Sequence, residues 1–228
     1  MAVVLLVLVV LLLGALVVGD RWAEAQAEER AAQRLQTELG TPTQPSVEIE
    51  GLPFLTQLAA QRLSSVHVVA DDVSPPDQPG TSMQHVDLRL HGLTSPDRLQ
   101  TFAAERVEGT ASIDYATAKA LTGQALTYAR DGRVELSNQT ELLGLNVTAK
   151  VQGRPAVNQE DQTLTLDEPS VTVAGVEVPD VTSQALLDTL AKSAPIKGVP
   201  YGLQVTSITA EPDRLVVGLV GKDVTFSR

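Results

Sequence analysis

The side chains with the most chemistry to offer are three histidines, His67, His85 and His91. The apolar and polar residues alternate around Asp87, which predicts a β-strand on which His85, Asp87 and His91 share one face. Imidazole and carboxylate groups together are ligands that a divalent metal could use. Their spacing, however, matches no tight ligand motif such as H-E-x-x-H. We therefore expect solvated residues on a strand face and no metal site.

The sequence also lacks the motifs that usually carry catalysis or cofactor binding. Serine, histidine and aspartate are all present, but no G-x-S-x-G turn exposes a nucleophile. There is no P-loop and no G-x-G-x-x-G that opens a helix. The absence of cysteine excludes a disulfide framework, thiolate metal sites and a cysteine nucleophile. We expect no catalytic residue, no cofactor and a protein that is not an enzyme.

Charge and composition narrow the classes of partner. The chain has 228 residues and a formal net charge of −11, which argues against nucleic acid because nucleic-acid binding needs basic patches. The same charge argues against broad electrostatic docking on anionic lipid headgroups. Aromatic residues make up only 3% of the chain, so stacking platforms for bases or sugars are not expected. A bound lipid would be held mainly by apolar contact.

Residues 2–19 are all apolar or glycine. As a helix this run spans about 27 Å, close to the ~30 Å hydrocarbon core of a bilayer. The alternative is a signal peptide cleaved after Ala25 or Ala27, but signal h-regions are usually ~7–15 residues long and no Lys or Arg precedes this run. We expect residues 1–19 to be an uncleaved, single-pass signal anchor in the cell membrane. The main domain would then be extracytoplasmic, and periplasmic in a bacterial envelope.

Residues 20–40 are rich in Ala, Glu and Gln, which are strong helix formers. Ala31, Leu35 and Leu39 recur at four-residue spacing, and Gly40 with Pro42 marks the end of the helix. This pattern has two interpretations. The helix is either a solvated stalk or a helix whose apolar stripe packs on the domain.

The remainder, residues 41–228, is long enough for one sizeable domain. Most of it alternates apolar and polar residues, which predicts eight to ten strands with four helices. One predicted helix begins at Ser95 and buries Phe102 and Ala103, a second begins at Asp114, and a third covers residues 181–192. Strands and helices do not alternate regularly, so we expect an α+β fold with a largely antiparallel sheet.

Several short motifs, in this order, resemble those of one family. They are G-L-P-F-L-T-Q at residues 51–57 with S-V-H-V at 65–68, L-H-G-L at 90–93, G-T-A-S-I-D-Y at 109–115 and G-K-D-V at 221–224. Together with the apolar run, they resemble the LmeA-like phospholipid-binding proteins of the actinobacterial cell envelope, which are similar to tubular lipid-binding (TULIP-like) proteins. The chain departs from the family after the T-Q helix, where relatives often carry glycine; this concerns only the end of that helix.

The resemblance implies a single TULIP-like domain whose curved sheet wraps around helices. It also implies a phospholipid or other membrane lipid as ligand, a supporting role in envelope lipoglycan or mannan assembly, and an envelope glycosyltransferase as partner. Long one-sided apolar strands fit a lipid groove, although the same faces could simply close a core. The expected lipid-contacting residues are Phe54, Leu55, Leu58, Val86, Leu88, Leu90, Leu215, Val217 and Leu219.

Two other functions stay open at this point. The domain could be a structural or adaptor module that binds an envelope enzyme without a lipid ligand. It could also be an envelope hydrolase, for which the sequence offers the least support.

Overall fold

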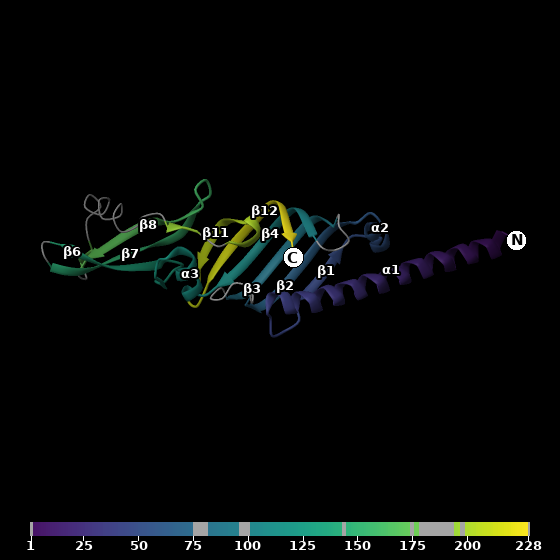
Figure 1. Cartoon of the computed structure of the whole chain (residues 1–228), viewed down its shortest axis with the longest axis horizontal. Coiled ribbons are helices and arrows are strands. Elements are labelled where there is room, and N and C mark those ends of the chain that lie inside the picture. The colour runs from purple at the N-terminus through teal and green to yellow at the C-terminus, as the bar shows by residue number, and fades with distance from the viewer. Residues whose placement is uncertain are drawn as a thin grey trace.

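The computed structural model of the chain describes residues 2–74, 82–95, 101–142, 145–173, 176–177, 194–196 and 199–227. In this part of the chain the fold is α+β, and the strand pairs are antiparallel. The strands form two sheets, which lie one after the other along the long axis of the molecule (Figure 1). The α+β class and the antiparallel pairing agree with the prediction from the sequence.

The first sheet, sheet A, lies at the centre of the molecule. Its strand order is β1-β2-β3-β4-β12-β11, so the last two strands of the chain complete a sheet begun by the first four. The strands are β1 (Ser46–Glu50), β2 (Arg62–Val73), β3 (Met83–Thr94), β4 (Thr101–Ile113), β11 (Gln204–Ala210) and β12 (Leu215–Ser227).

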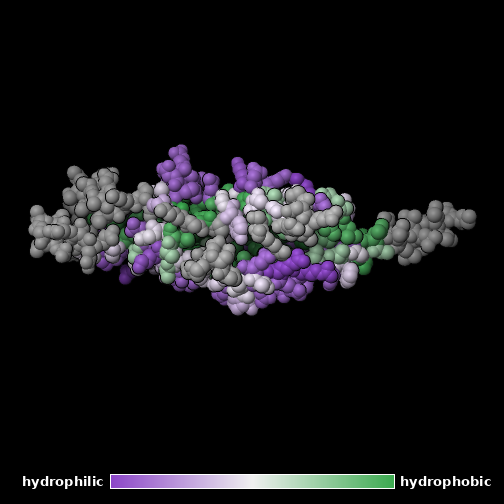
Figure 2. Space-filling view, in the orientation of Figure 1, coloured by the Kyte–Doolittle hydropathy of each residue, from purple (hydrophilic) through white to green (hydrophobic). Residues whose placement is uncertain are grey.

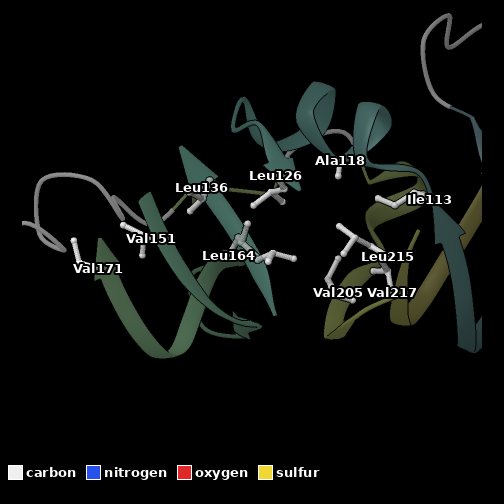
Figure 3. Close-up of a cluster of buried hydrophobic side chains, with 12 residues drawn as sticks. Ile113, Ala118, Leu126, Leu136, Val151, Leu164, Val171, Val205, Leu215 and Val217 are labelled. Carbon is white, nitrogen blue, oxygen red and sulfur yellow. The ribbon is translucent and has the colours of Figure 1, made fainter. Parts of the chain in front are cut away.

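The second sheet, sheet B, lies at the end away from the N-terminus and has the order β10-β8-β7-β6-β5, with β9 paired to β8 (Figure 1). A buried cluster joins it to sheet A: Leu136 and Leu164 of sheet B belong to the same core as Val205 and Leu215 of β11 and β12 (Figure 3). The bounds are β5 (Leu126–Tyr128), β6 (Val134–Leu142), β7 (Leu145–Asn158), β8 (Thr163–Val173), β9 (Val176–Glu177) and β10 (Ala194–Pro195).

Helix α1 (Ala2–Leu39) runs along one side of sheet A and projects beyond it toward the N-terminus (Figure 1). Ala32 is buried with Val47, Ile49 and Val66, and Leu39 packs on a separate cluster of the same sheet. The C-terminal half of α1 is therefore a packing helix, the second of the two interpretations of residues 20–40. The other helices are short: α2 (Phe54–Ala59), α3 (Tyr115–Thr122) and the 3-10 turn η1 (Pro200–Gly202).

The predicted anchor, residues 1–19, falls on the first half of α1. The side chains before Gly14 lie outside the described residues. Within the described residues, we find no helix that combines the length and the apolar character needed to cross a membrane.

Three structural predictions from the sequence are not matched by the structure. Two of them differ from it, and the third concerns residues outside the described part of the chain. The helix expected from Ser95 does not include Phe102 and Ala103. These two residues lie in β4, which pairs with β12. The curved sheet expected to wrap around helices is divided into two sheets in sequence, with α1 on one side of sheet A. The helix expected at residues 181–192 lies outside the described residues.

Candidate lipid-binding surface

The strand register of sheet A places apolar residues in continuous rows on one face. In one row, Val68 is opposite Leu88, which is opposite Gly109, which is opposite Leu219. Because side chains alternate between the faces of a strand, the residues two positions away in each strand lie on this face as well. The two neighbouring rows are Val66–Leu90–Val107–Gly221 and Ala70–Val86–Ala111–Val217.

Burial is uneven across this apolar face. Val107 has no exposed surface, and Val86 and Val217 are each only 8% exposed. Leu88, Leu90 and Leu219 are half-buried although they lie near the middle of the face. Leu88 and Leu219 contact both the cluster under Leu39 and the cluster around Leu203 and Val224. We call these three leucines the central leucines. Together with the half-buried Val68 at the end of their row, they are the apolar side chains of the face that still expose surface.

Gly109 lies between Leu88 and Leu219 and sets how closely β3 and β4 approach. Its φ is +156°, and a Cβ added there would press against the backbone carbonyl oxygen of Asp87 and lie 2.9 Å from the Cα of Leu88. Only glycine fits so close an approach of two backbones. The absence of a side chain at Gly109 also leaves the two leucines as the bulky groups of this row.

The rest of the G-T-A-S-I-D-Y motif is structural. Ala111 and Ile113 are buried, and the carboxylate of Asp114 accepts a hydrogen bond from the backbone N–H of Thr117 at 2.7 Å. Asp114 is thus the N-cap of α3, as predicted from the sequence. The hydroxyl of Tyr115 donates to the carbonyl of Glu211 at 2.7 Å and joins α3 to the turn between β11 and β12. Burial, with smaller contributions from nearby negative groups, raises the pKa of Tyr115 to about 12.

The nine residues predicted to touch lipid separate into two groups. Val86, Leu88, Leu90, Leu215, Val217 and Leu219 lie together on the apolar face. Of the three residues of α2, Phe54 is buried in a cluster with Ala32 of α1 and Val66 of the apolar face, whereas Leu55 and Leu58 are 45% and 52% exposed. The expected placement of Leu55 and Leu58 against the apolar face was wrong. Their helix lies at the end of sheet A where α1 leaves the domain (Figure 1).

The opposite face of sheet A is polar and carries the three histidines. His67 donates to Asp87 at 2.8 Å, His85 to Asp71 at 2.7 Å and His91 to Glu108 at 3.2 Å. The bond from His91, helped by the nearby Arg106, lowers the pKa of Glu108. Each histidine thus has a carboxylate of its own. Within the described residues, no three His, Asp or Glu side chains come together as metal ligands would.

Two buried or half-buried carboxylates on α1 play roles that the sequence did not suggest. Asp20 accepts hydrogen bonds from the backbone N–H groups of Phe54 and Leu55, and Glu28 accepts one from Ile49 at 2.8 Å. The first pair satisfies the free N–H groups at the start of α2, and Glu28 binds an N–H of edge strand β1. Acidic residues in a polar helix give no signal of such long-range partners. These bonds fix α1 to the sheet.

One surface pocket of about 380 Å³ also lies on α1. Its lining side chains are mostly charged or amide groups, including Arg30, Arg34 and Gln33. It is separate from the central leucines, which come from β3 and β12. Its polar lining does not suit an acyl chain.

The comparison with known families found one match. The LmeA-like phospholipid-binding family matches residues 18–219, which is most of the chain. The protein belongs to this family, which the sequence motifs had predicted. No curated protein and no solved structure matches the chain.

Proposed function

We propose that the protein is a non-enzymatic phospholipid carrier or presenter that holds acyl chains against the central leucines of sheet A. The observation that carries this proposal is the uneven burial of the apolar face. Leu88, Leu90 and Leu219 are half-buried in the middle of a face on which most of the other positions are buried. Covering such apolar surface with an acyl chain is favourable by roughly 25 cal/mol per Å². Membership in a phospholipid-binding family supports the choice of ligand.

The chemistry of the faces supports an apolar mode of binding. The polar and charged side chains of β3, such as Arg89 and His85, project from the polar face, whereas Leu88 and Leu90 project from the other. With a net charge of −11, the chain offers little general attraction to anionic headgroups. Acyl contact rather than headgroup charge would then supply most of the affinity.

We further propose that α1 tethers the protein to a membrane through residues 1–19, with sheets A and B on the extracytoplasmic side. The support is the uninterrupted apolar sequence of this run, which is continuous with the helix docked on sheet A. A protein held there with a bound phospholipid could supply lipid to enzymes that assemble envelope lipoglycan or mannan. An envelope glycosyltransferase is the partner that this role calls for.

The test of lipid binding uses the full chain, because α1 supplies part of the core of sheet A. The protein is purified in a detergent that lacks acyl chains resembling phospholipid, extracted with organic solvent and analysed by mass spectrometry. We expect phospholipid at close to one molecule or more for each protein chain. Protein that is folded but free of phospholipid, and that takes up none from vesicles, would contradict the proposal.

A further inference from the structure

Four large apolar side chains lie exposed around the start of α2. They are Trp22, Leu52, Leu55 and Leu58, which are 69%, 64%, 45% and 52% exposed. Trp22 lies on α1, Leu52 in the turn before α2, and the other two on α2 itself. We call these four residues the apical patch. A surface of this kind on a folded domain usually marks a binding site for another molecule or a membrane.

The hydrogen bonds of Asp20 hold the apical patch at one level along α1. Its carboxylate accepts from the N–H of Phe54 at 2.9 Å and of Leu55 at 2.7 Å, and Asp20 itself is only 6% exposed. The first turn of α2 therefore lies beside residue 20 of α1. Trp22 is two residues further on, about 200° around the helix, so it lies at nearly the same level but on the side of α1 away from α2. Figure 2 shows hydrophobic surface at this end of the domain, where α1 leaves it.

Within α1, the apical patch adjoins further exposed apolar surface. Leu16, Val17 and Val18 are 57%, 62% and 70% exposed and are separated from Asp20 only by Gly19. They end the apolar run of residues 2–19, whose helical length of about 27 Å nearly matches a bilayer core of about 30 Å. If the run lies in the bilayer, the edge of the hydrocarbon layer falls at residues 19–22. The bonds of Asp20 then place α2 at the same depth.

We propose that the apical patch is a second membrane contact, which rests in the interfacial layer of the bilayer that α1 enters. Tryptophan favours this layer because its ring is apolar and its N–H is polar. The leucines of α2 would enter the boundary between headgroups and acyl chains, as the apolar side of an interfacial helix does. The docked patch would hold sheet A close to the lipid surface. This inference rests on the proposed tether but does not depend on lipid binding at the central leucines.

The chain offers a direct test because it has one tryptophan and no cysteine. The full chain is reconstituted into vesicles of phosphatidylcholine and phosphatidylglycerol, with or without bromine on the upper part of the acyl chains. Trp22 fluorescence reports its own contact with bromine. Leu58→Cys, carrying an environment-sensitive fluorophore, reports contact by α2. The matched control is Glu160→Cys with the same fluorophore, in the exposed turn between β7 and β8 of sheet B.

We expect brominated lipid to quench Trp22 and the label at position 58, and to leave the label at position 160 unchanged. Leu55→Glu should reduce quenching of the label at position 58 without lowering the melting temperature, because Leu55 is exposed. Absence of quenching at either Trp22 or position 58 would overturn the proposal. The proposal would also be overturned if the chain self-associates through the apical patch, so that the patch contacts protein instead of lipid. If the quenching test fails but solvent extraction still recovers phospholipid from the protein, the second membrane contact is wrong and the proposed lipid-binding function is still supported.

Discussion

The carboxylate of Asp20 accepts a hydrogen bond from the backbone N–H of Phe54 at 2.9 Å, although the two residues are 34 positions apart. Pro53, the N-cap residue just before α2, offers no side-chain hydrogen bond to cap the helix. Asp20 therefore supplies from α1 the negative charge that a helix N-terminus favours. The contact joins the helix that carries the apolar run to the first motif of the domain.

Removal of the Asp20 carboxylate should loosen α2 and the start of sheet A. A buried hydrogen bond to a charged group contributes about 1.5–3 kcal/mol. We expect Asp20→Ala to lower the free energy of unfolding by about 2–4 kcal/mol, since both N–H groups lose their acceptor. Asp20→Asn keeps one acceptor, so its free energy of unfolding should lie between those of the native chain and Asp20→Ala. Urea denaturation measures this effect, with Glu29→Ala, an exposed position on α1, as the control. Equal stability of Asp20→Ala and Glu29→Ala would show that the cap is unimportant.

Gly109→Ala should be far more damaging than an ordinary glycine substitution. Its Cβ would meet the backbone of β3 at Asp87, so β3 and β4 must separate. We expect a loss of about 3 kcal/mol or more in the free energy of unfolding. Gly123→Ala is the matched control, because its φ of +72° is also positive but a Cβ there meets nothing within 4 Å. The control should lose only about 1–2 kcal/mol, the cost of a left-handed conformation. Similar losses in both variants would contradict the close approach.

Tyr115 should make stability fall at alkaline pH. Its pKa in the folded protein is about 12 against an ordinary value of 10.0, so the folded state holds the phenolic proton more tightly than the unfolded state. The stabilising contribution is complete below pH 10 and is lost as the pH rises toward 12. We expect Tyr115→Phe to be less stable than the native chain by about 1 kcal/mol at pH 8, through loss of the bond to Glu211.

The difference between these two proteins should then narrow as the pH rises from 9 to 11.5, measured by urea denaturation at each pH. Both proteins share every other titrating group, so the comparison isolates Tyr115. Parallel stability profiles over this range would show that the phenol is not perturbed by its surroundings.

Much of the fold could be predicted because alternation and capping are local signals. The period of two in β3 identified Leu88 and Leu90 as one face, and Asp114 was identified as a cap because its partner, Thr117, is three residues away. The family motifs could likewise be read from short stretches. These features depend on neighbours in the sequence, so the sequence alone contains the needed information.

The failures come from contacts between distant residues. Phe102 and Ala103 had a helical start signal nearby, but pairing with β12 placed them in a strand. Leu55 and Leu58 are apolar, but Asp20 fixes α2 so that only Phe54 is buried. No local pattern reports that a carboxylate in one helix will bind the N–H groups of another.

Replacement of all three histidines by glutamine should leave phospholipid binding unchanged. His67, His85 and His91 all lie on the polar face, where each pairs with a carboxylate, and the central leucines lie on the other face. Each of these side-chain hydrogen bonds contributes only about 0.5–1.5 kcal/mol, so the melting temperature should fall modestly. The measurement is phospholipid bound per chain alongside a thermal melt. Loss of lipid binding in a folded triple variant would give these residues a functional role.

The sharpest test of the central leucines is Leu88→Trp. The larger side chain stays apolar but fills the space beside Gly109 and Leu219, where we place an acyl chain. Overpacking a filled core costs about 1–3 kcal/mol, whereas occupying a groove should cost little stability. We therefore expect a several-fold reduction in bound phospholipid with a small change in melting temperature. Arg89→Trp is the control, because it places the same side chain on the exposed, opposite face of β3.

The two measurements separate a groove from a closed core. In a groove, only Leu88→Trp loses lipid, and both variants melt near the native chain. In a closed core, Leu88→Trp melts well below Arg89→Trp, and any fall in bound phospholipid follows the fraction of unfolded protein. The second result would mean that Leu88 packs against protein alone, and that acyl chains do not bind beside Gly109.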